Sequence, residues 1–230
     1  MGIAERYRKV AAEVAEVARA AGRDPEEVRL VAVSKTVGLE GVAEAMAGGA
    51  RDFGENRPDQ ITAKAPAFPD ARWHFIGNIQ SRRIPDIVAC ASLIHSLHEL
   101  RHAEKIDHAA AALGKVQDVL IEVNVSGEES KSGVAPDEAL DLVRAAAALP
   151  HVRVRGLMTM APQGNAAVAA ETFRGLARLA DDIRDQLDED SAAVFTELSM
   201  GMSEDWREAI ACGATIVRVG RAIFSDSFEE

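Results

Sequence analysis

The sequence predicts one α/β domain covering residues 1–230, a closed (β/α)8 barrel of the TIM type with an extra helix before its first strand. Eight short apolar runs alternate strictly with longer helical patterns, and no linker rich in glycine, serine or proline interrupts the 230 residues. Strict alternation implies parallel strands that are joined by right-handed crossovers. Eight such units over this chain length favour a closed barrel over an open sheet.

The first two elements have clear boundaries. Apolar residues recur at steps of three and four over residues 3–21, which predicts an amphipathic helix that Gly22 ends. A proline turn with an acidic cap follows at residues 24–27. Residues 30–33, LVAV, form a short apolar run, and this run predicts a buried strand that stops at Lys35.

The remaining elements follow in alternation. Helices are expected where apolar residues recur at helical spacing, and several of them stop at glycine or proline. We expect these helices at residues 39–47, 58–64, 82–89, 99–113, 136–149, 166–187 and 204–211. We expect a strand that ends near residue 56, and further strands at residues 73–77, 92–97, 119–125, 152–158, 195–198 and 216–219.

The end of the chain bears on how the barrel closes. Only a few residues follow Phe224, so we expect no full eighth outer helix and expect the N-terminal helix to cover the gap. An open doubly wound sheet is the alternative fold. A dinucleotide-binding sheet of that kind carries GxGxxG after its first strand, whereas residues 33–38 read VSKTVG.

Composition excludes several classes of protein. The formal charge is −11 with 47% hydrophobic residues, which argues against a nucleic-acid-binding or anionic-membrane-binding surface. No apolar stretch approaches the roughly 20 residues that span a bilayer. The N-terminus is charged throughout, unlike a signal peptide. Cys90 and Cys212 lie far apart in the sequence, which favours two reduced thiols over a disulfide. We therefore expect a cytoplasmic protein, and a compact barrel with a complete rim suggests a monomer.

Lys35 is the residue that most needs an explanation, because it follows directly on a buried strand. One interpretation is ordinary: the aliphatic stem covers apolar surface while the ammonium reaches water. The functional interpretation is a partly desolvated amine that forms an imine with an aldehyde. The position of Lys35 alone leaves both interpretations open.

Polar residues at the other strand ends favour the functional interpretation, because the carboxyl ends of the strands in such a barrel form one rim. Residues 199–203, SMGMS, precede a predicted helix whose backbone N–H groups could hold a phosphate, and Gly220 could let a second segment approach it. Serine caps and glycine turns are also common without a ligand, and Glu204 and Asp205 compete for the helix end. The rim rule collects Lys35, Asn56, Gly77, Asn124, Thr159, residues 199–203 and residues 218–221.

Several segments carry a family resemblance, and they cover almost the whole chain in order. They are AVSKT (32–36), FGEN (53–56), WHFIGNIQ (73–80), SGEESKSG (126–133), GLMTM (156–160), ELSMGMSEDWREAI (197–210) and VRVGRAIF (217–224). In these segments the sequence resembles the pyridoxal phosphate homeostasis protein family, whose fold is similar to the barrel domain of alanine racemase.

The resemblance implies a cofactor and its contacts. Pyridoxal 5'-phosphate (PLP) would be held by Lys35 as an aldimine, with Asn56 and Met200 near the cofactor and Arg218 facing the pyridine nitrogen. Its phosphate would be held by Ser199, Gly201, Ser203, Gly220 and Arg221.

The arginine has a chemical consequence. A guanidinium stays protonated and donates to the ring nitrogen, so the ring is a weaker electron sink. Racemases of similar fold add a second domain and a tyrosine from a partner chain, whereas the one tyrosine here is Tyr7 on the N-terminal helix. We therefore expect a protein that buffers PLP or delivers it to PLP-dependent apo-enzymes, rather than an enzyme. A PLP-dependent amino-acid racemase or lyase is the alternative.

The sequence departs from the family pattern at several rim positions. Arg57-Pro58-Asp59 follows GEN where an aromatic residue is usual, and Arg82-Arg83 replaces an Asn-Lys pair. Ser225 replaces a glycine, and Arg221 stands where a small hydroxyl residue is frequent; Arg221 could bind phosphate or point outward.

A metal motif and a second lysine compete with this interpretation. Residues 98–102 match HExxH, which in a zinc hydrolase places two histidines one helical turn apart, but the match is short and a solvated helix face also explains it. We expect no metal. Lys131 lies on a predicted rim loop and is either a solvent charge or a second group that takes up or releases the aldehyde. Asp118, Glu122 and Asn124 alternate with apolar residues on the fifth strand, and we expect them to be polar barrel filling rather than catalytic acids.

Overall fold

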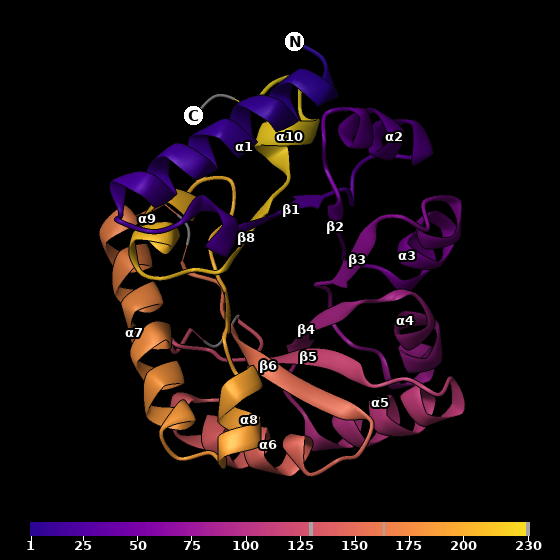
Figure 1. The fold of residues 1–230 in the computed structure, drawn as a ribbon, viewed down its shortest axis with the longest axis vertical. Coiled ribbons are helices and arrows are strands. Elements are labelled where there is room, and N and C mark those ends of the chain that lie inside the picture. The colour runs from indigo at the N-terminus through magenta and orange to yellow at the C-terminus, as the bar shows by residue number, and fades with distance from the viewer. Residues whose placement is uncertain (129–130, 163, 229–230) are drawn as a thin grey trace.

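The computed structural model describes residues 1–128, 131–162 and 164–228, and its eight strands close into a barrel in sequence order (Figure 1). All pairs are parallel, and β8 pairs with β1 from Arg29 opposite Ile216 to Ala32 opposite Val219. The (β/α)8 prediction is confirmed, and the open-sheet alternative is wrong. The strands are β1 (Arg29–Val33), β2 (Asp52–Glu55), β3 (Arg72–Phe75), β4 (Leu93–Leu97), β5 (Gln117–Glu122), β6 (Val152–Met158), β7 (Glu197–Ser199) and β8 (Ile216–Val219).

Helices surround the barrel, and most lie where the sequence predicts them. Short 3-10 turns accompany them at Pro25–Glu27, Ala65–Ala67, Ser81–Arg83 and Pro136–Glu138. None of the helices in the described ranges combines the length and apolar character that a membrane-spanning segment requires. The helices are α1 (Ile3–Ala20), α2 (Leu39–Ala47), α3 (Pro58–Lys64), α4 (Ile84–Cys90), α5 (Leu100–Ala112), α6 (Ala139–Ala147), α7 (Ala166–Arg184), α8 (Glu189–Val194), α9 (Trp206–Ala211) and α10 (Arg221–Phe224).

Helix α1 covers the seam where β8 meets β1, as the sequence predicts. It contacts α2, α9 and α10, and Figure 1 shows it lying across the last elements of the chain. Val10 and Val14 are buried on its inner face, and the buried Arg6 donates from Nε to the carbonyl oxygen of Ile223 at 2.7 Å. A single helical turn, α10, does follow β8, which the sequence prediction left out.

Helix α8 is a second element that the sequence prediction missed. It has only six residues, too few to show a helical period. Its first turn is held by Asp188, whose carboxylate accepts from the backbone N–H of Ser191 at 2.9 Å. The local cap, rather than an apolar stripe, therefore defines this helix.

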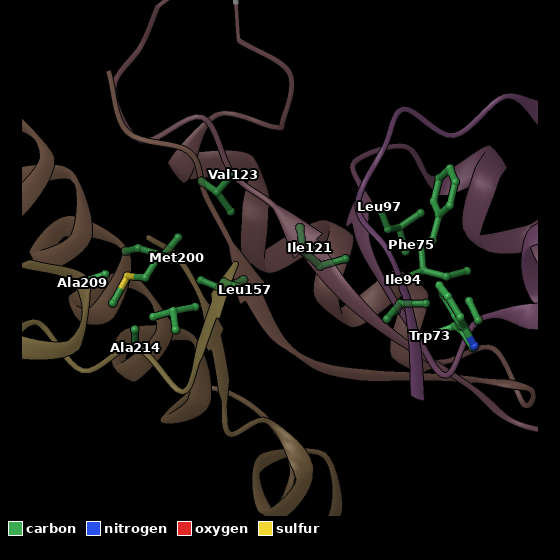
Figure 2. Packing of buried hydrophobic residues seen from close by; sticks show 14 of the residues in the cluster. Trp73, Phe75, Ile94, Leu97, Ile121, Val123, Leu157, Met200, Ala209 and Ala214 are labelled. Carbon is green, nitrogen blue, oxygen red and sulfur yellow. The ribbon is translucent and has the colours of Figure 1, made fainter. Parts of the chain in front are cut away.

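The core has two layers, because successive residues of each strand point to opposite faces. One layer lies between the strands and the helices, where Figure 2 shows Trp73, Phe75 and Ile94 on one side and Met200 beside Ala209 on the other. A separate apolar cluster is contributed by alternate residues of five strands and fills the inside of the barrel: Val31, Leu93, Leu120, Met158 and Ile216.

Gly156 is expected to be irreplaceable in this barrel. Its φ is +149°, and an added Cβ would lie 1.9 Å from the carbonyl oxygen of Glu197 on the paired strand. We expect Gly156→Ala to lower the free energy of unfolding by about 3 kcal/mol or more, measured by urea denaturation. Gly38→Ala is the control, since its φ is negative and its Cβ would meet no atom within 4 Å. An equal loss in both variants would contradict the prediction.

Asp52 lies at the amino-terminal end of the barrel, and its hydrogen bonds should make the stability of the fold depend on pH. Burial alone would raise its pKa, but hydrogen bonds from Arg72 and His74 outweigh burial and lower the pKa from 3.8 to about 2. A lowered folded-state pKa stabilises the fold above the unfolded value, and this contribution disappears as the pH falls from 3.8 to about 2. Relative to Asp52→Asn, the unmodified chain should lose about 2 kcal/mol more over this window in urea unfolding series. Parallel curves would contradict it.

Candidate functional site

The carboxyl ends of the strands enclose a cavity of about 540 Å³. Its wall takes residues from the ends of all eight strands or the loops after them, which places it at the mouth that the rim rule predicts. Six of the nine predicted cofactor-binding residues line it: Lys35, Asn56, Ser203, Arg218, Gly220 and Arg221.

Lys35 lies in the turn after β1 and borders the cavity. Lys35 is exposed, because the strand stops at Val33 and the turn carries Lys35 past the buried layer. Within the described part of the chain, its ammonium has no hydrogen-bond or ion-pair partner. The amine is therefore available to a ligand in the cavity.

A buried ion pair holds the backbone just before Lys35. Lys64 donates from Nζ to Glu55 Oε1 at 2.6 Å and to the carbonyl oxygen of Ser34 at 2.9 Å. The Ser34 hydroxyl donates to the same Glu55 oxygen at 2.6 Å. The side chains of Lys64 and Glu55 are 3% and 0% exposed, so the pair is shielded from water. Sequence reasoning missed it, because a lysine at a helix end resembles an ordinary solvent charge.

Arg218 is the buried cation of the site. It lines the cavity, donates from Nη1 to Ser199 Oγ at 2.6 Å and from Nη2 to the carbonyl oxygen of Thr159 at 3.1 Å. Burial lowers the pKa of Arg218 to about 10, and the carboxylates of Asp205 and Glu122 oppose this shift. The guanidinium therefore stays charged at neutral pH and acts only as a donor.

The loops after β7 and β8 meet at Ser203 and Gly220. The Gly220 N–H donates to Ser203 Oγ at 3.3 Å, and both residues line the cavity. An added Cβ at Gly220 would lie 3.3 Å from the carbonyl oxygen of Val33, so this close approach of β8 to β1 favours glycine. The two loops therefore offer a hydroxyl and backbone groups at one corner of the cavity.

One detail of the predicted phosphate loop is wrong. The sequence predicts a helix that begins at residue 204, but α9 begins at Trp206. The reason is Asp205, whose carboxylate accepts from the Met202 N–H at 2.6 Å and closes a turn there. Burial raises the pKa of Asp205. The acidic competitor that the sequence suggested therefore occupies part of this loop.

The other predicted residues lie elsewhere. Ser199 is fully buried beneath the cavity, bonded to Arg218 and to a histidine, and Met200 packs in the outer core layer beside Ala209 (Figure 2). Gly201 has a φ of +90°, and its carbonyl oxygen accepts from the Arg218 N–H, which brings the two loops together. These three are not on the cavity wall.

Two predicted residues of uncertain role can now be placed. Arg221 lines the cavity and forms an ion pair with Glu204 at 2.7 Å. Lys131 is half-buried on the loop after β5 and does not border the cavity. Of the resemblance segment that contains it, positions 129 and 130 lie outside the described residues.

The arginines that depart from the family pattern behave differently from one another. Arg57 borders the cavity. Arg83 pairs with Asp59 and Asp86 on the outer helices, so it ties α3 to α4, and Arg82 is exposed.

Glu122 borders the cavity, which sequence reasoning missed by assigning it to barrel filling. Its side chain is 3% exposed, and its Oε2 has no hydrogen-bond partner in the described ranges. His98 Nδ1 lies 3.6 Å from that oxygen, and the carboxylate raises the pKa of His98. Because Glu122 stands at the end of the predicted fifth strand, the rim rule could have placed its carboxylate at the cavity.

The HExxH match does not form a zinc-site geometry. His98 precedes α5, Glu99 is the residue before its first turn, and only His102 lies on the helix. His102 is buried against Ser81 Oγ at 3.0 Å rather than lying on a solvated face. Among the described residues, no group of three or more His, Cys, Asp or Glu side chains could hold a metal ion.

Comparison with known proteins gives full-length matches. A family model described as the alanine racemase N-terminal domain matches residues 7–227. The pyridoxal phosphate homeostasis protein of Pseudomonas aeruginosa is 43% identical, covering 96% of this chain and 94% of that protein. The protein of the same name from Aquifex aeolicus is 38% identical, covering 98% and 99%. PipY of Synechococcus elongatus, solved with PLP bound, has a TM-score of 0.81 at 33% identity, covering 97% of this chain and 100% of PipY.

The matches agree with one another and with the resemblance that the sequence segments carry. They extend over nearly the whole length of both partners in each comparison, and the barrel is shared with PipY. The chain therefore belongs to the alanine racemase N-terminal domain family and, within it, to the pyridoxal phosphate homeostasis proteins.

Proposed function

We propose that this chain, as one PLP-binding domain, holds pyridoxal 5'-phosphate in the rim cavity and buffers or delivers it without strong catalysis of its own. The observation that carries the proposal is the exposed amine of Lys35, which has no partner among the described residues, on the wall of a cavity that the buried Arg218 cation also lines. The names of the relatives and the PLP bound to PipY support the same ligand.

The residues present fit this cofactor. Lys35 would hold its aldehyde carbon, because an amine without a charged partner is free to react. Ser203, Gly220 and Arg221 supply a hydroxyl, backbone groups and a cation for the phosphate, and Arg218 would donate to the ring. Asn56 borders the same cavity, and Ser199, Met200 and Gly201 would act from beneath it through the loop that they form. When bound, PLP supplies an electron sink, which a donating guanidinium weakens.

The carrier role is favoured over a racemase or lyase. A racemase of similar fold uses an opposing tyrosine from a partner chain, whereas the one tyrosine here, Tyr7, lies on α1 near Arg51, Arg72 and Asp52 at the other end of the barrel. Burial raises the pKa of Tyr7. The curated relatives carry the name of a homeostasis protein.

We further propose that PLP-dependent apo-enzymes receive the cofactor, and that the chain acts in the cytoplasm as a monomer. The net charge of −11 supports a protein that associates with neither nucleic acid nor anionic membranes. Transfer to an apo-enzyme requires that the cofactor reaches solvent, and the exposure of Lys35 supports this.

Peptide mapping tests the proposal. The purified chain, incubated with PLP, is expected to absorb visible light, and borohydride should bleach the band and leave a phosphopyridoxyl group on the peptide that contains Lys35. Incubation with a panel of amino acids should give no turnover. A label on another lysine, or no label, would contradict the proposed cofactor site, whereas rapid turnover of an amino acid would favour the racemase or lyase.

Lys131 is proposed as a second lysine that takes up or releases the aldehyde. It lies on the loop after β5, at the same end of the barrel as the cavity. We expect Lys131→Ala to keep PLP on Lys35 but to slow transfer to an apo-enzyme by about tenfold, followed by recovery of that enzyme's activity. Transfer at the rate of the unmodified chain would show that Lys131 is only a solvent charge.

A further inference from the structure

A continuous chain of hydrogen bonds runs through the barrel interior, from the rim to the opposite end. Arg218 Nη1 lies 2.6 Å from Ser199 Oγ, which lies 2.8 Å from His95 Nδ1. His95 Nε2 lies 2.9 Å from His74 Nδ1, and His74 Nε2 lies 3.0 Å from Asp52 Oδ1. All five side chains are buried, and they come from β8, β7, β4, β3 and β2.

The direction of each bond follows from the chemistry of the groups. Asp52 is ionised and only accepts, so His74 must carry its proton on Nε2. A neutral His74 then accepts at Nδ1, which places the proton of His95 on Nε2. His95 accepts at Nδ1 from the Ser199 hydroxyl, and the serine oxygen accepts from Arg218. Every bond therefore points from Arg218 toward Asp52.

Both histidines are neutral in this scheme, and their surroundings agree. Burial lowers the pKa of His74 in spite of its hydrogen bond to Asp52. Burial, together with the neighbouring His74 and Arg218, lowers the pKa of His95 well below its ordinary value. The reverse direction would require a charged histidine or a protonated Asp52, and both are costly in the interior.

Such a chain is not needed to fill a barrel, since apolar side chains do so in the adjacent layer. Among the described residues, the guanidinium of Arg218 donates to Ser199 Oγ and to the carbonyl oxygen of Thr159, and these bonds fix its plane. Arg218 also lines the cavity, so its guanidinium can reach a bound ligand.

We propose that Ser199, His95, His74 and Asp52 are positioning residues for Arg218, and that their one-way chain holds the guanidinium as a donor toward the ring of bound PLP. The inference rests on the proposed function and deepens it. It assigns to Ser199 a role beneath the cavity, instead of a direct contact with phosphate, and it gives a purpose to two histidines that no motif singles out.

Nitrogen-15 NMR of the histidine rings tests the chain in the unmodified protein without cofactor. We expect His74 and His95 to be neutral at neutral pH, each with its proton on Nε2. A proton on Nδ1 of either ring, or a charged ring, would overturn the chain. This measurement needs no substitution, so it decides the direction of the bonds even where a variant does not fold.

Ser199→Ala tests the effect on the cofactor. Removal of the hydroxyl leaves Arg218 Nη1 without its acceptor, so we expect PLP affinity to fall by about tenfold and the visible absorption maximum to shift. Thr172→Val is the matched control, since it removes a buried hydroxyl whose bond, in the described ranges, goes to the carbonyl oxygen of Val168 on its own helix. Unchanged affinity and absorption in Ser199→Ala would overturn the proposal. Failure of the proposed function is distinct, because then the unmodified chain itself would take up no PLP.

Discussion

Replacement of Lys35 with alanine is expected to abolish the covalent attachment of PLP that borohydride reduction makes permanent, while the barrel keeps its stability. The amine is the group that would react with the aldehyde, and alanine offers no substitute. Because Lys35 is exposed and has no partner in the described part of the chain, its loss should change the free energy of unfolding by no more than about 0.5 kcal/mol. Mass spectrometry after reduction and urea unfolding measure the two effects.

Lys35→Arg is the matched control for charge. It keeps a cation at the mouth of the cavity but offers a guanidinium that is a poor nucleophile, so it should lose the attachment as Lys35→Ala does. Residual non-covalent binding is expected in both variants, since Arg218 and Arg221 remain. A stable attachment in either variant would show that another lysine holds the cofactor.

Replacement of Lys64 with methionine is expected to destabilise the barrel by about 3–5 kcal/mol, because it leaves the buried Glu55 charge without its cation. Glu55 Oε1 would keep only the Ser34 hydroxyl, and its Oε2 already has no hydrogen-bond partner among the described residues. Urea unfolding measures the loss. The turn that carries Lys35 should loosen as well, which a slower attachment of PLP would show.

Two further variants separate the ion pair from general effects. The double variant Glu55→Leu with Lys64→Met removes both charges and should recover much of the lost stability. Lys105→Met replaces an exposed lysine on α5 and should change the free energy of unfolding by no more than about 0.5 kcal/mol. If Lys64→Met lowers the free energy of unfolding no more than Lys105→Met does, the buried pair of Lys64 and Glu55 does not stabilise the fold.

The sequence predicts the barrel well where the pattern is local. β6 at Val152–Met158 and β8 at Ile216–Val219 have their predicted bounds, as do α2 and α3, because apolar runs and glycine or proline mark their ends. Helix α8 and the one-turn α10 are too short to give a periodic signal.

Placement around the mouth is also predictable, because strand ends share one rim. What the sequence cannot show is which side chains bond across the barrel: His74 and His95 are 2.9 Å apart although they belong to different strands. The exposure of Lys35 and the capping role of Asp205 depend on the local path of the backbone, which residue types alone do not specify.

The position of α1 has a consequence for synthesis of the chain. Its inner face is covered by α9 and α10, which are synthesised long after it, and β1 completes its pairing only when β8 has been made. A growing chain therefore holds Val10, Val14 and an open edge of β1 without their final partners until the segment from β8 to α10 has been synthesised. Until then the edge of β1 that β8 covers in the folded barrel is unpaired, and an unpaired strand edge favours aggregation and binding by molecular chaperones.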